Sequence, residues 1–239
     1  MGDIVLMALI AGLGTCLGAL LVITCGRLSP PTISSLLGFA AGVMTAVVVI
    51  DLLPSSLQYG SLTATLTGCV AGIMLMACLD LGLNILAPSL YKGSNYLKMG
   101  YLIAAGIALH DLPEGFAIAA GFAAAEKLGP LLAVAIGLHN IPEGMATAAP
   151  LRYGGMNNCR ILALNAAISL VTPLGTCAGL VLVETSTTFI GALLAFAAGA
   201  MTYIILGELA PASRRNHNKL AYAGMLAGFG LIALLNFNA

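Results

Sequence analysis

Charged side chains are scarce in this sequence. Only 8% of its 239 residues are Asp, Glu, Lys or Arg, and 60% are hydrophobic, whereas a typical soluble domain has about 25% charged and about 45–50% apolar residues. The formal net charge is zero, with nine basic and nine acidic residues, so composition indicates no surface for nucleic acid. We therefore interpret the chain as an integral membrane protein embedded in a lipid bilayer.

Other features are missing as well. No basic segment precedes the first apolar run, which follows Asp3, so this run is expected to remain as a transmembrane helix and not to be cleaved as a signal peptide. No connection is long enough to form a second unit, so residues 1–239 are expected to form one transmembrane domain. Five of the six cysteines lie in or at the ends of apolar runs, which argues against a disulfide framework.

Long apolar runs make up most of the chain. A helix that crosses a bilayer needs about 20 mostly apolar residues. Eight segments meet this requirement: 4–25, 33–53, 62–86, 99–123, 130–149, 161–183, 189–210 and 220–236. The sequence therefore predicts an all-α membrane protein with eight transmembrane helices, and the even number places both termini on one side.

The distribution of lysine and arginine predicts the orientation. Eight of the nine basic residues fall in the first, third, fifth and seventh connections: Arg27, Lys92, Lys98, Arg152, Arg160, Arg214, Arg215 and Lys219. The other side has Lys127 and the acids Asp3, Glu126 and Glu184. Because basic loops stay in the cytoplasm, we expect a multi-pass protein of the cell inner membrane with both termini outside, in the periplasm.

Six acidic residues remain at membrane depth. Each costs about 2.5–3.5 kcal/mol at the centre of a spanning helix, so they are expected to face the interior of the bundle with partners, water or ions. They are Asp51, Asp80, Asp111, Glu114, Glu143 and Glu208.

Two internal repeats contain most of these acids. Leu-His-Asp-Leu-Pro-Glu-Gly at 109–115 returns as Leu-His-Asn-Ile-Pro-Glu-Gly at 138–144, on predicted helices four and five. The segment 39–54 returns at 196–211, on helices two and seven, with its acid and its proline in register. Since the two copies of each pair run in opposite directions through the membrane, the sequence predicts inverted repeats, which are typical of secondary transporters.

The doubled motif has the chemistry of a metal site. A histidine and a glutamate four residues apart lie on one face of a helix, so two antiparallel copies bring His110, Glu114, His139 and Glu143 to one level. Two imidazoles and two carboxylates suit zinc and neutralise a divalent ion. For one copy alone, a structural histidine and a proton-carrying glutamate remain the alternative.

Asp111 and Asn140 follow the two histidines directly. If both glutamates bridge, these oxygen donors complete a second, harder site beside the first, with ions about 3.5–4 Å apart. The alternative is a hydrogen bond to a neighbouring helix, which carries as much weight as metal binding for Asn140 and less for the charged Asp111.

The doubled motif within eight helices resembles the ZIP (Zrt/Irt-like) family of divalent metal transporters, in its short bacterial form. The resemblance covers essentially the whole chain. It implies uptake of Zn²⁺, often with Fe²⁺, Mn²⁺, Co²⁺ or Cd²⁺, into the cytoplasm through a binuclear site between helices four and five, and it implies a homodimer. The resemblance implies that the ligands of the first site are His110, Glu114, His139 and Glu143. It implies that the ligands of the second site are Asp111, Asn140 and the same two glutamates.

The sequence departs from this family in two places. Many relatives have a glutamate before the proline of helix six, where this chain has Thr172, so the second site is expected to be weaker. The connection at 87–98 is short and lacks histidine, so a metal-sensing loop is not expected. Some relatives use a methionine of helix two as a ligand; Met44 is the nearest candidate here, although core packing is the favoured role.

Two further acids are predicted to lie on the transport path. Asp51 on helix two is expected near the outer face and Glu208 on helix seven near the inner face, attracting the metal at the entrance and accepting it at the exit. The alternative for each is a carboxylate that caps a helix end beside a loop proline.

Two other classes of function could use the same residues. An intramembrane metalloenzyme is disfavoured because no His-Glu-x-x-His is present and four protein ligands leave no open position on zinc. A cation or proton channel without defined coordination would use the carboxylates alone. We expect a transporter and not an enzyme, with no cofactor beyond the transported ion.

Overall fold

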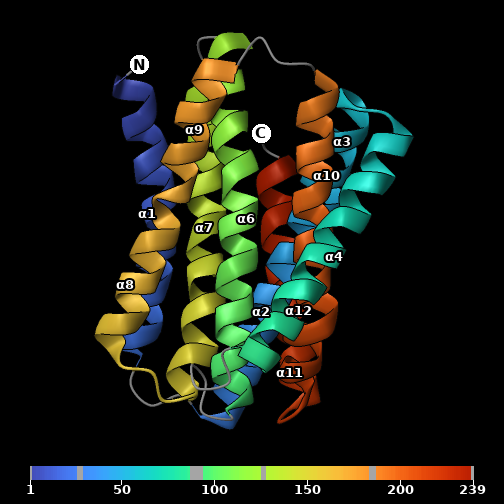
Figure 1. The fold of residues 1–239 in the computed structure, drawn as a ribbon. Helices are drawn as coiled ribbons and strands as arrows, with labels where there is room; N and C mark the ends of the chain where they lie inside the picture. The colour runs from blue at the N-terminus through green and yellow to red at the C-terminus, as the bar shows by residue number, and fades with distance from the viewer. Residues whose placement is uncertain (1, 26–28, 87–93, 125–127, 183–186, 238–239) are drawn as a thin grey trace.

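The computed structural model describes residues 2–25, 29–86, 94–124, 128–182 and 187–237, and the regular elements in these ranges are all helical (Figure 1). They are α1 (Gly2–Thr24), α2 (Pro30–Ala46), η1 (Val47–Leu52), α3 (Leu53–Tyr59), α4 (Leu62–Leu86), α6 (Asn95–Ala124), α7 (Leu128–Tyr153), α8 (Asn158–Ser169), α9 (Val171–Leu182), α10 (Thr187–Ile204), η2 (Ile205–Leu209), α11 (Ala210–Arg214) and α12 (Asn218–Phe237). Five charged residues of the orientation argument lie outside the described ranges: Arg27, Lys92, Glu126, Lys127 and Glu184.

The helices form two groups that lie side by side (Figure 1). In one group α1 packs along α7 and α8, and α6 packs along α7 and α9. In the other group α2 packs along α12, and α4 packs along α10. The groups meet where α6 contacts α10 and where α2 contacts α7. The two copies of the His-Asx-x-Pro-Glu motif therefore lie on neighbouring helices, α6 and α7, as the repeat predicted.

The helix predicted over 161–183 begins earlier and is interrupted. Asn157 caps α8, because its side chain accepts a hydrogen bond from the backbone N–H of Cys159. The α-helical bonding then stops at Leu170, between α8 and α9. Pro173 explains the interruption, since it has no N–H to donate and its ring crowds the preceding turn.

Two helices widen into a π-helical segment just before a proline. The N–H of Leu53 bonds to the carbonyl of Val48, and the N–H of Ala210 bonds to that of Ile205, each five residues back. Pro54 and Pro211 follow directly. π-Helical turns are rare and frequent at functional sites. Asp51 and Glu208 lie in these two segments.

Six of the eight predicted spans are confirmed. Among the described residues, the helices long and apolar enough to cross a membrane are Gly2–Thr24, Pro30–Tyr59, Leu62–Ile85, Asn95–Phe122, Asn158–Val181 and Thr188–Arg214. The other two predicted spans correspond to α7, which carries polar motif residues and two prolines, and to Asn218–Leu234 in α12, which is shorter. The chain is thus a multi-pass membrane protein, and the full count of eight remains a prediction.

The described basic residues all lie toward one end of the bundle. They are Lys98, Arg152, Arg160, Arg214, Arg215 and Lys219. They lie in the first turns of α6, α8 and α12, in the last turn of α7, and in or directly after α11. These parts of the helices are at the lower end of the bundle in Figure 1. We call this the basic end. Large apolar side chains cover the sides, for example Leu66, Val70 and Met74 on α4, as expected for a surface that faces lipid.

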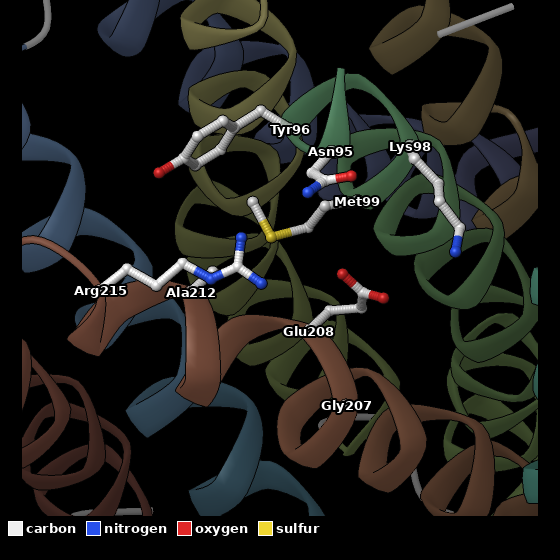
Figure 2. Close-up of a pocket in the computed structure, with 8 residues that line it drawn as sticks. All are labelled: Asn95, Tyr96, Lys98, Met99, Gly207, Glu208, Ala212 and Arg215. Atoms are coloured by element: carbon white, nitrogen blue, oxygen red, sulfur yellow. The ribbon is translucent and has the colours of Figure 1, made fainter. Parts of the chain in front are cut away.

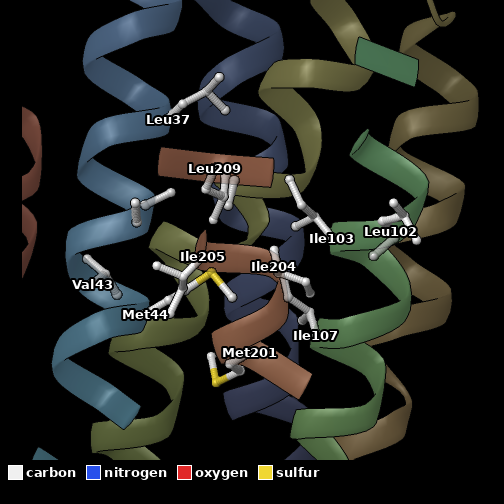
Figure 3. Close-up of a cluster of buried hydrophobic side chains, with 14 of the residues drawn as sticks. Leu37, Val43, Met44, Leu102, Ile103, Ile107, Met201, Ile204, Ile205 and Leu209 are labelled. Carbon is white, nitrogen blue, oxygen red and sulfur yellow. The ribbon is translucent and has the colours of Figure 1, made fainter. Parts of the chain in front are cut away.

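An apolar core joins the two groups of helices below the middle of the bundle. Side chains from α2, α6 and α10 interdigitate there without solvent exposure (Figure 3). Met44, Ile103, Ile107, Met201 and Ile204 are among its fully buried members. This cluster, which we call the central core, lies one to two turns from His110 along α6, on the side of the basic end.

Candidate metal site

The paired motifs bring three ligand atoms close together. Glu114 Oε1 lies 2.6 Å from His110 Nε2 and 2.5 Å from His139 Nε2. One ligand atom each from His110, Glu114 and His139 lies within 4.8 Å of the other two, which is the spacing of a candidate metal-binding group. Because a zinc ion has bonds of about 2.0–2.1 Å to nitrogen and oxygen, small side-chain rotations are enough to place all three around one ion.

The fourth predicted ligand lies close by. Glu143 Oε1 is 3.6 Å from His110 Nε2. Since α6 and α7 run in opposite directions, His139 and Glu114 form the level farther from the basic end, and His110 and Glu143 form the level nearer to it. The structure therefore brings together all four residues that the sequence proposed for the first site.

The site is buried and rich in polar atoms without partners. His110 and Glu143 have no solvent exposure, whereas the side chain of His139 is 12% exposed. Among the described residues, Nδ1 of His110, one oxygen of Glu114 and both oxygens of Glu143 have no hydrogen-bond partner in the protein, while Nε2 of His110 contacts Glu114. Buried polar groups are normally bonded, and a cation held by two carboxylates and by one nitrogen of each imidazole would satisfy the carboxylate oxygens.

The second pair of predicted ligands is also buried. Asp111 has no exposure, and neither of its carboxylate oxygens has a hydrogen-bond partner within the described chain. Asn140 donates from Nδ2 to the carbonyl of Ala11 on α1 at 3.0 Å, while its Oδ1 has no partner there. The alternative of an interhelical bond is thus correct for the amide nitrogen of Asn140, and this bond leaves the amide oxygen available to an ion.

Glycines hold the site helices against their outer neighbours. A Cβ on Gly115 would collide with the backbone of Thr172 and Gly175, and a Cβ on Gly144 would collide with the backbone of Thr15. Gly18 approaches the carbonyl of Ile141 in the same way. The motif glycines therefore allow α6 to contact α9 and α7 to contact α1, backbone to backbone.

This packing exposes a repeat that sequence reasoning missed. Thr15-Cys16-Leu17-Gly18 and Thr172-Pro173-Leu174-Gly175 share the pattern Thr-x-Leu-Gly, and Thr15 and Thr172 are 157 positions apart, as are Phe39 and Phe196 of the recognised repeat. Thr15 contacts Gly144 as Thr172 contacts Gly115. Gly18 contacts Ile141 as Gly175 contacts Leu112, so the two copies occupy matching places. Comparison at the fixed spacing of 157 would have found it.

Three other predicted residues lie away from this cluster. Met44 lies in the central core beside Ile205 (Figure 3), which agrees with the favoured core role; its role as a metal ligand remains a prediction. Asp51 is half-buried in η1. Glu208 lines a cavity of about 190 Å³ with Lys98 and Arg215 at the basic end (Figure 2).

Asp80 has the partners that were expected for the acids at membrane depth, although the sequence did not say which residues they are. It forms an ion pair of 2.5 Å with Lys98 and accepts a hydrogen bond of 2.9 Å from the hydroxyl of Tyr203. These contacts join α4, α6 and α10 next to the Glu208 cavity. Asp80 thus ties together the helices of both groups at the basic end.

Comparison with known proteins places this arrangement among metal transporters. A family model described as ZIP zinc transporter matches residues 87–236. The protein named zinc transporter ZupT of Chlorobium phaeovibrioides is 34% identical in an alignment 257 residues long with its gaps, which covers 96% of this chain and 95% of that protein. ZupT of Corynebacterium glutamicum is 31% identical over 252 residues, with 95% of each chain covered. Zinc transporter ZIPB of Bordetella bronchiseptica is 31% identical over 239 residues, covering 93% of this chain and 76% of that protein.

Proposed function

The chain belongs to the ZIP zinc transporter family, and from this premise we propose that it carries divalent metal ions, zinc first among them, across the cell inner membrane into the cytoplasm. The proposed site lies between α6 and α7, with His110, Glu114, His139 and Glu143 as ligands of the first ion. Fe²⁺, Mn²⁺ and Cd²⁺ are proposed as further substrates, because the same oxygen and nitrogen donors bind them.

One observation supports this function above all others. The ligand atoms of His110, Glu114 and His139 converge within 4.8 Å in the interior of a membrane protein, with Glu143 in contact with His110. Intramembrane ionisable residues are costly and mark ion pathways. A cluster of two imidazoles and two carboxylates is neutralised by one divalent cation, which lowers that cost.

The exposure of the site supports uptake. His139, at the level farther from the basic end, is the more exposed histidine, and His110 and Glu143, nearer to the basic end, are fully buried. The level of the site farther from the basic end is thus the more exposed one. Since basic segments stay in the cytoplasm, we propose that the ion enters from the periplasm, and that both termini lie there.

We propose a second ion beside the first. Asp111, Asn140 Oδ1 and the two bridging glutamates would hold it, and the unpartnered oxygens of Asp111 and Asn140 support this assignment. Thr172, also buried with an unpartnered hydroxyl, offers only a neutral ligand, so this ion is expected to bind more weakly than the first.

Replacing Asp111 by alanine is expected to remove the second ion alone. Zinc binding by purified protein, measured by equilibrium dialysis, should fall from about two ions per chain to about one, and the tighter affinity should weaken by no more than about 10–100-fold, as for a residue outside the first coordination shell. Ser34→Ala, which removes another buried side chain with an unpartnered oxygen, on α2, is the control. Loss of both ions, or of neither, would contradict the assignment of two sites.

We also propose the eight-helix architecture with inverted repeats. α7 has 26 residues, about 39 Å at 1.5 Å per residue, which is enough to cross the hydrocarbon layer of about 30 Å. The π-helical segments before Pro54 and Pro211, and the matching Thr-x-Leu-Gly contacts on α1 and α9, support a relation between the two halves. A homodimer is proposed from the family, and the roles of Asp51 and Glu208 on the transport path remain predictions.

The alternatives make different predictions for flux. Liposomes that contain the purified protein, and no zinc at the start, are expected to take up zinc at a rate that saturates with zinc concentration. Cadmium is expected to inhibit this uptake by competition, because each ion must occupy the ligand cluster. Flux that rises linearly with concentration and needs no divalent ion would support a channel. Metal-dependent turnover of a peptide or lipid would support an enzyme, whereas the relatives reported above are named transporters.

A further inference from the structure

The route from the metal site to the basic end is closed by apolar packing on the side of α2 and α10. Between Met99, which borders the Glu208 cavity, and His110, α6 presents Leu102, Ile103 and Ile107 without any exposure (Figures 2 and 3). They pack against Ile204 and other members of the central core. On this face of α6, the buried side chains between the site and the Glu208 cavity are thus apolar.

The opposite side of the site is polar. Asn165, Ser169, Thr172 and Thr176 are spaced by four, three and four residues and are all fully buried. This spacing places them on one face of α8 and α9, the face toward α1, α6 and α7, with which these helices pack. We call these four residues the polar row. It begins beside the metal site, where Thr176 donates to the carbonyl of Gly115, and runs toward the basic end.

Cys16 faces the polar row from α1. Its Sγ lies 3.3 Å from the hydroxyl of Ser169. Gly12, one turn earlier on the same face of α1, lies against the carbonyl of Ser169 and near the hydroxyl of Thr172. Since Thr15 contacts Gly144, next to the ligand Glu143, the thiol lies at about the level of the site nearer to the basic end.

Two atoms of the polar row have no partner. Asn165 Oδ1 and Thr172 Oγ1 are buried and make no hydrogen bond with any described residue. The hydroxyl of Ser169 and the amide nitrogen of Asn165 bond to backbone carbonyls of α8 itself, those of Asn165 and Ile161. These two bonds stay within α8, and the thiol of Cys16 is the interhelical partner of Ser169. Helix packing therefore leaves the buried oxygens of Asn165 and Thr172 unexplained.

We propose that Thr172, Ser169 with Cys16, and Asn165 form the inward half of the ion's route, offering hydroxyl, sulfur and amide ligands in turn between the His/Glu site and the basic end. This inference rests on the proposed transport function and adds its exit. Neutral oxygen ligands bind a divalent ion more weakly than carboxylates and imidazoles do, so the ion is passed on and not trapped. The single thiol favours zinc and cadmium over the harder Mn²⁺.

The thiol gives a direct test in the wild-type protein. Purified protein is treated with 2-aminoethyl methanethiosulfonate, a small cationic reagent that reacts with thiols from water, and the modified cysteines are identified by peptide mass. Cys69, also half-buried but on α4 against α10, is the matched control. Cys16 is expected to react at least about tenfold faster than Cys69, and saturating zinc is expected to slow Cys16 about tenfold.

Two outcomes would overturn the exit route while the proposed function stands: Cys16 reacting no faster than Cys69, or zinc failing to slow it although dialysis shows zinc bound. Absence of zinc binding to the untreated protein would instead overturn the proposed function and this inference with it.

Transport by variants of the row provides the second test. Asn165→Leu and Ser169→Ala are each expected to slow zinc uptake into liposomes at least about fivefold while zinc binding stays unchanged. Ser213→Ala is the control, because Ser213 is equally buried and also bonds only within its own segment, to the carbonyl of Ala210. A wild-type rate of zinc uptake by the folded Ser169→Ala variant would contradict the assignment. This test does not depend on whether the Asn165→Leu variant folds.

Discussion

Zinc uptake is expected to fall at least a hundredfold when His110 and His139 are both replaced by alanine. Each imidazole is one of the four proposed ligands, and both lie against the same oxygen of Glu114. Four-ligand zinc sites bind with about 10–16 kcal/mol, so one ligand contributes on the order of 3 kcal/mol, or about a hundredfold in affinity. The double variant keeps two carboxylates, which bind zinc weakly and without the nitrogen donors that favour it.

The measurement is uptake of zinc by liposomes that contain equal amounts of folded protein, together with zinc binding in detergent. His217→Ala is the matched control, because His217 is the third histidine of the chain and lies exposed before α12, where its ring accepts a hydrogen bond from the N–H of Leu220. Unchanged uptake in the double variant would refute the assignment of the site, although the protein would still be a zinc transporter. Uptake lost equally in the His217 variant would point to misfolding.

The Gly144→Ala variant is expected to lose about 3 kcal/mol of stability, near the upper end for overpacking of a close-packed interior. The added Cβ would meet backbone atoms of Thr15, and backbone cannot rotate away as a side chain can. α1 and α7 must then separate, which also moves Glu143 and His139. For a chain of this size the loss corresponds to a fall of about 10 °C in the melting temperature.

Gly82→Ala is the matched control for this substitution. Gly82 is also inside a long helix, α4, but nothing lies within 4 Å of a Cβ at its position. Alanine is the better helix former by about 1 kcal/mol, so this variant should melt at or above the wild-type temperature, measured by the loss of monodisperse protein on heating. Equal melting of the Gly144 variant and the wild type would mean that α1 and α7 do not touch at this place.

Composition and spacing were sufficient for the membrane class and for the clustering of the two histidines and two glutamates. Scarce charge and long apolar runs leave few folds available, because backbone groups in hydrocarbon must be bonded within helices or barrels. A histidine and a glutamate four residues apart lie on one helix face whatever surrounds them. The doubled motif on consecutive helices then predicted that His110, Glu114, His139 and Glu143 meet, and in the structure they do.

The rest depended on tertiary contacts. Three relations join residues that are far apart in the chain. The amide nitrogen of Asn140 bonds to α1, and Cys16 faces Ser169. Apolar side chains separate Glu208 from His110. Local periodicity says which face of a helix a residue occupies, but not which helix lies against that face. That choice is made by the fit of whole surfaces, here by glycines that let backbones touch, and it alone decided which polar residues surround the His/Glu cluster.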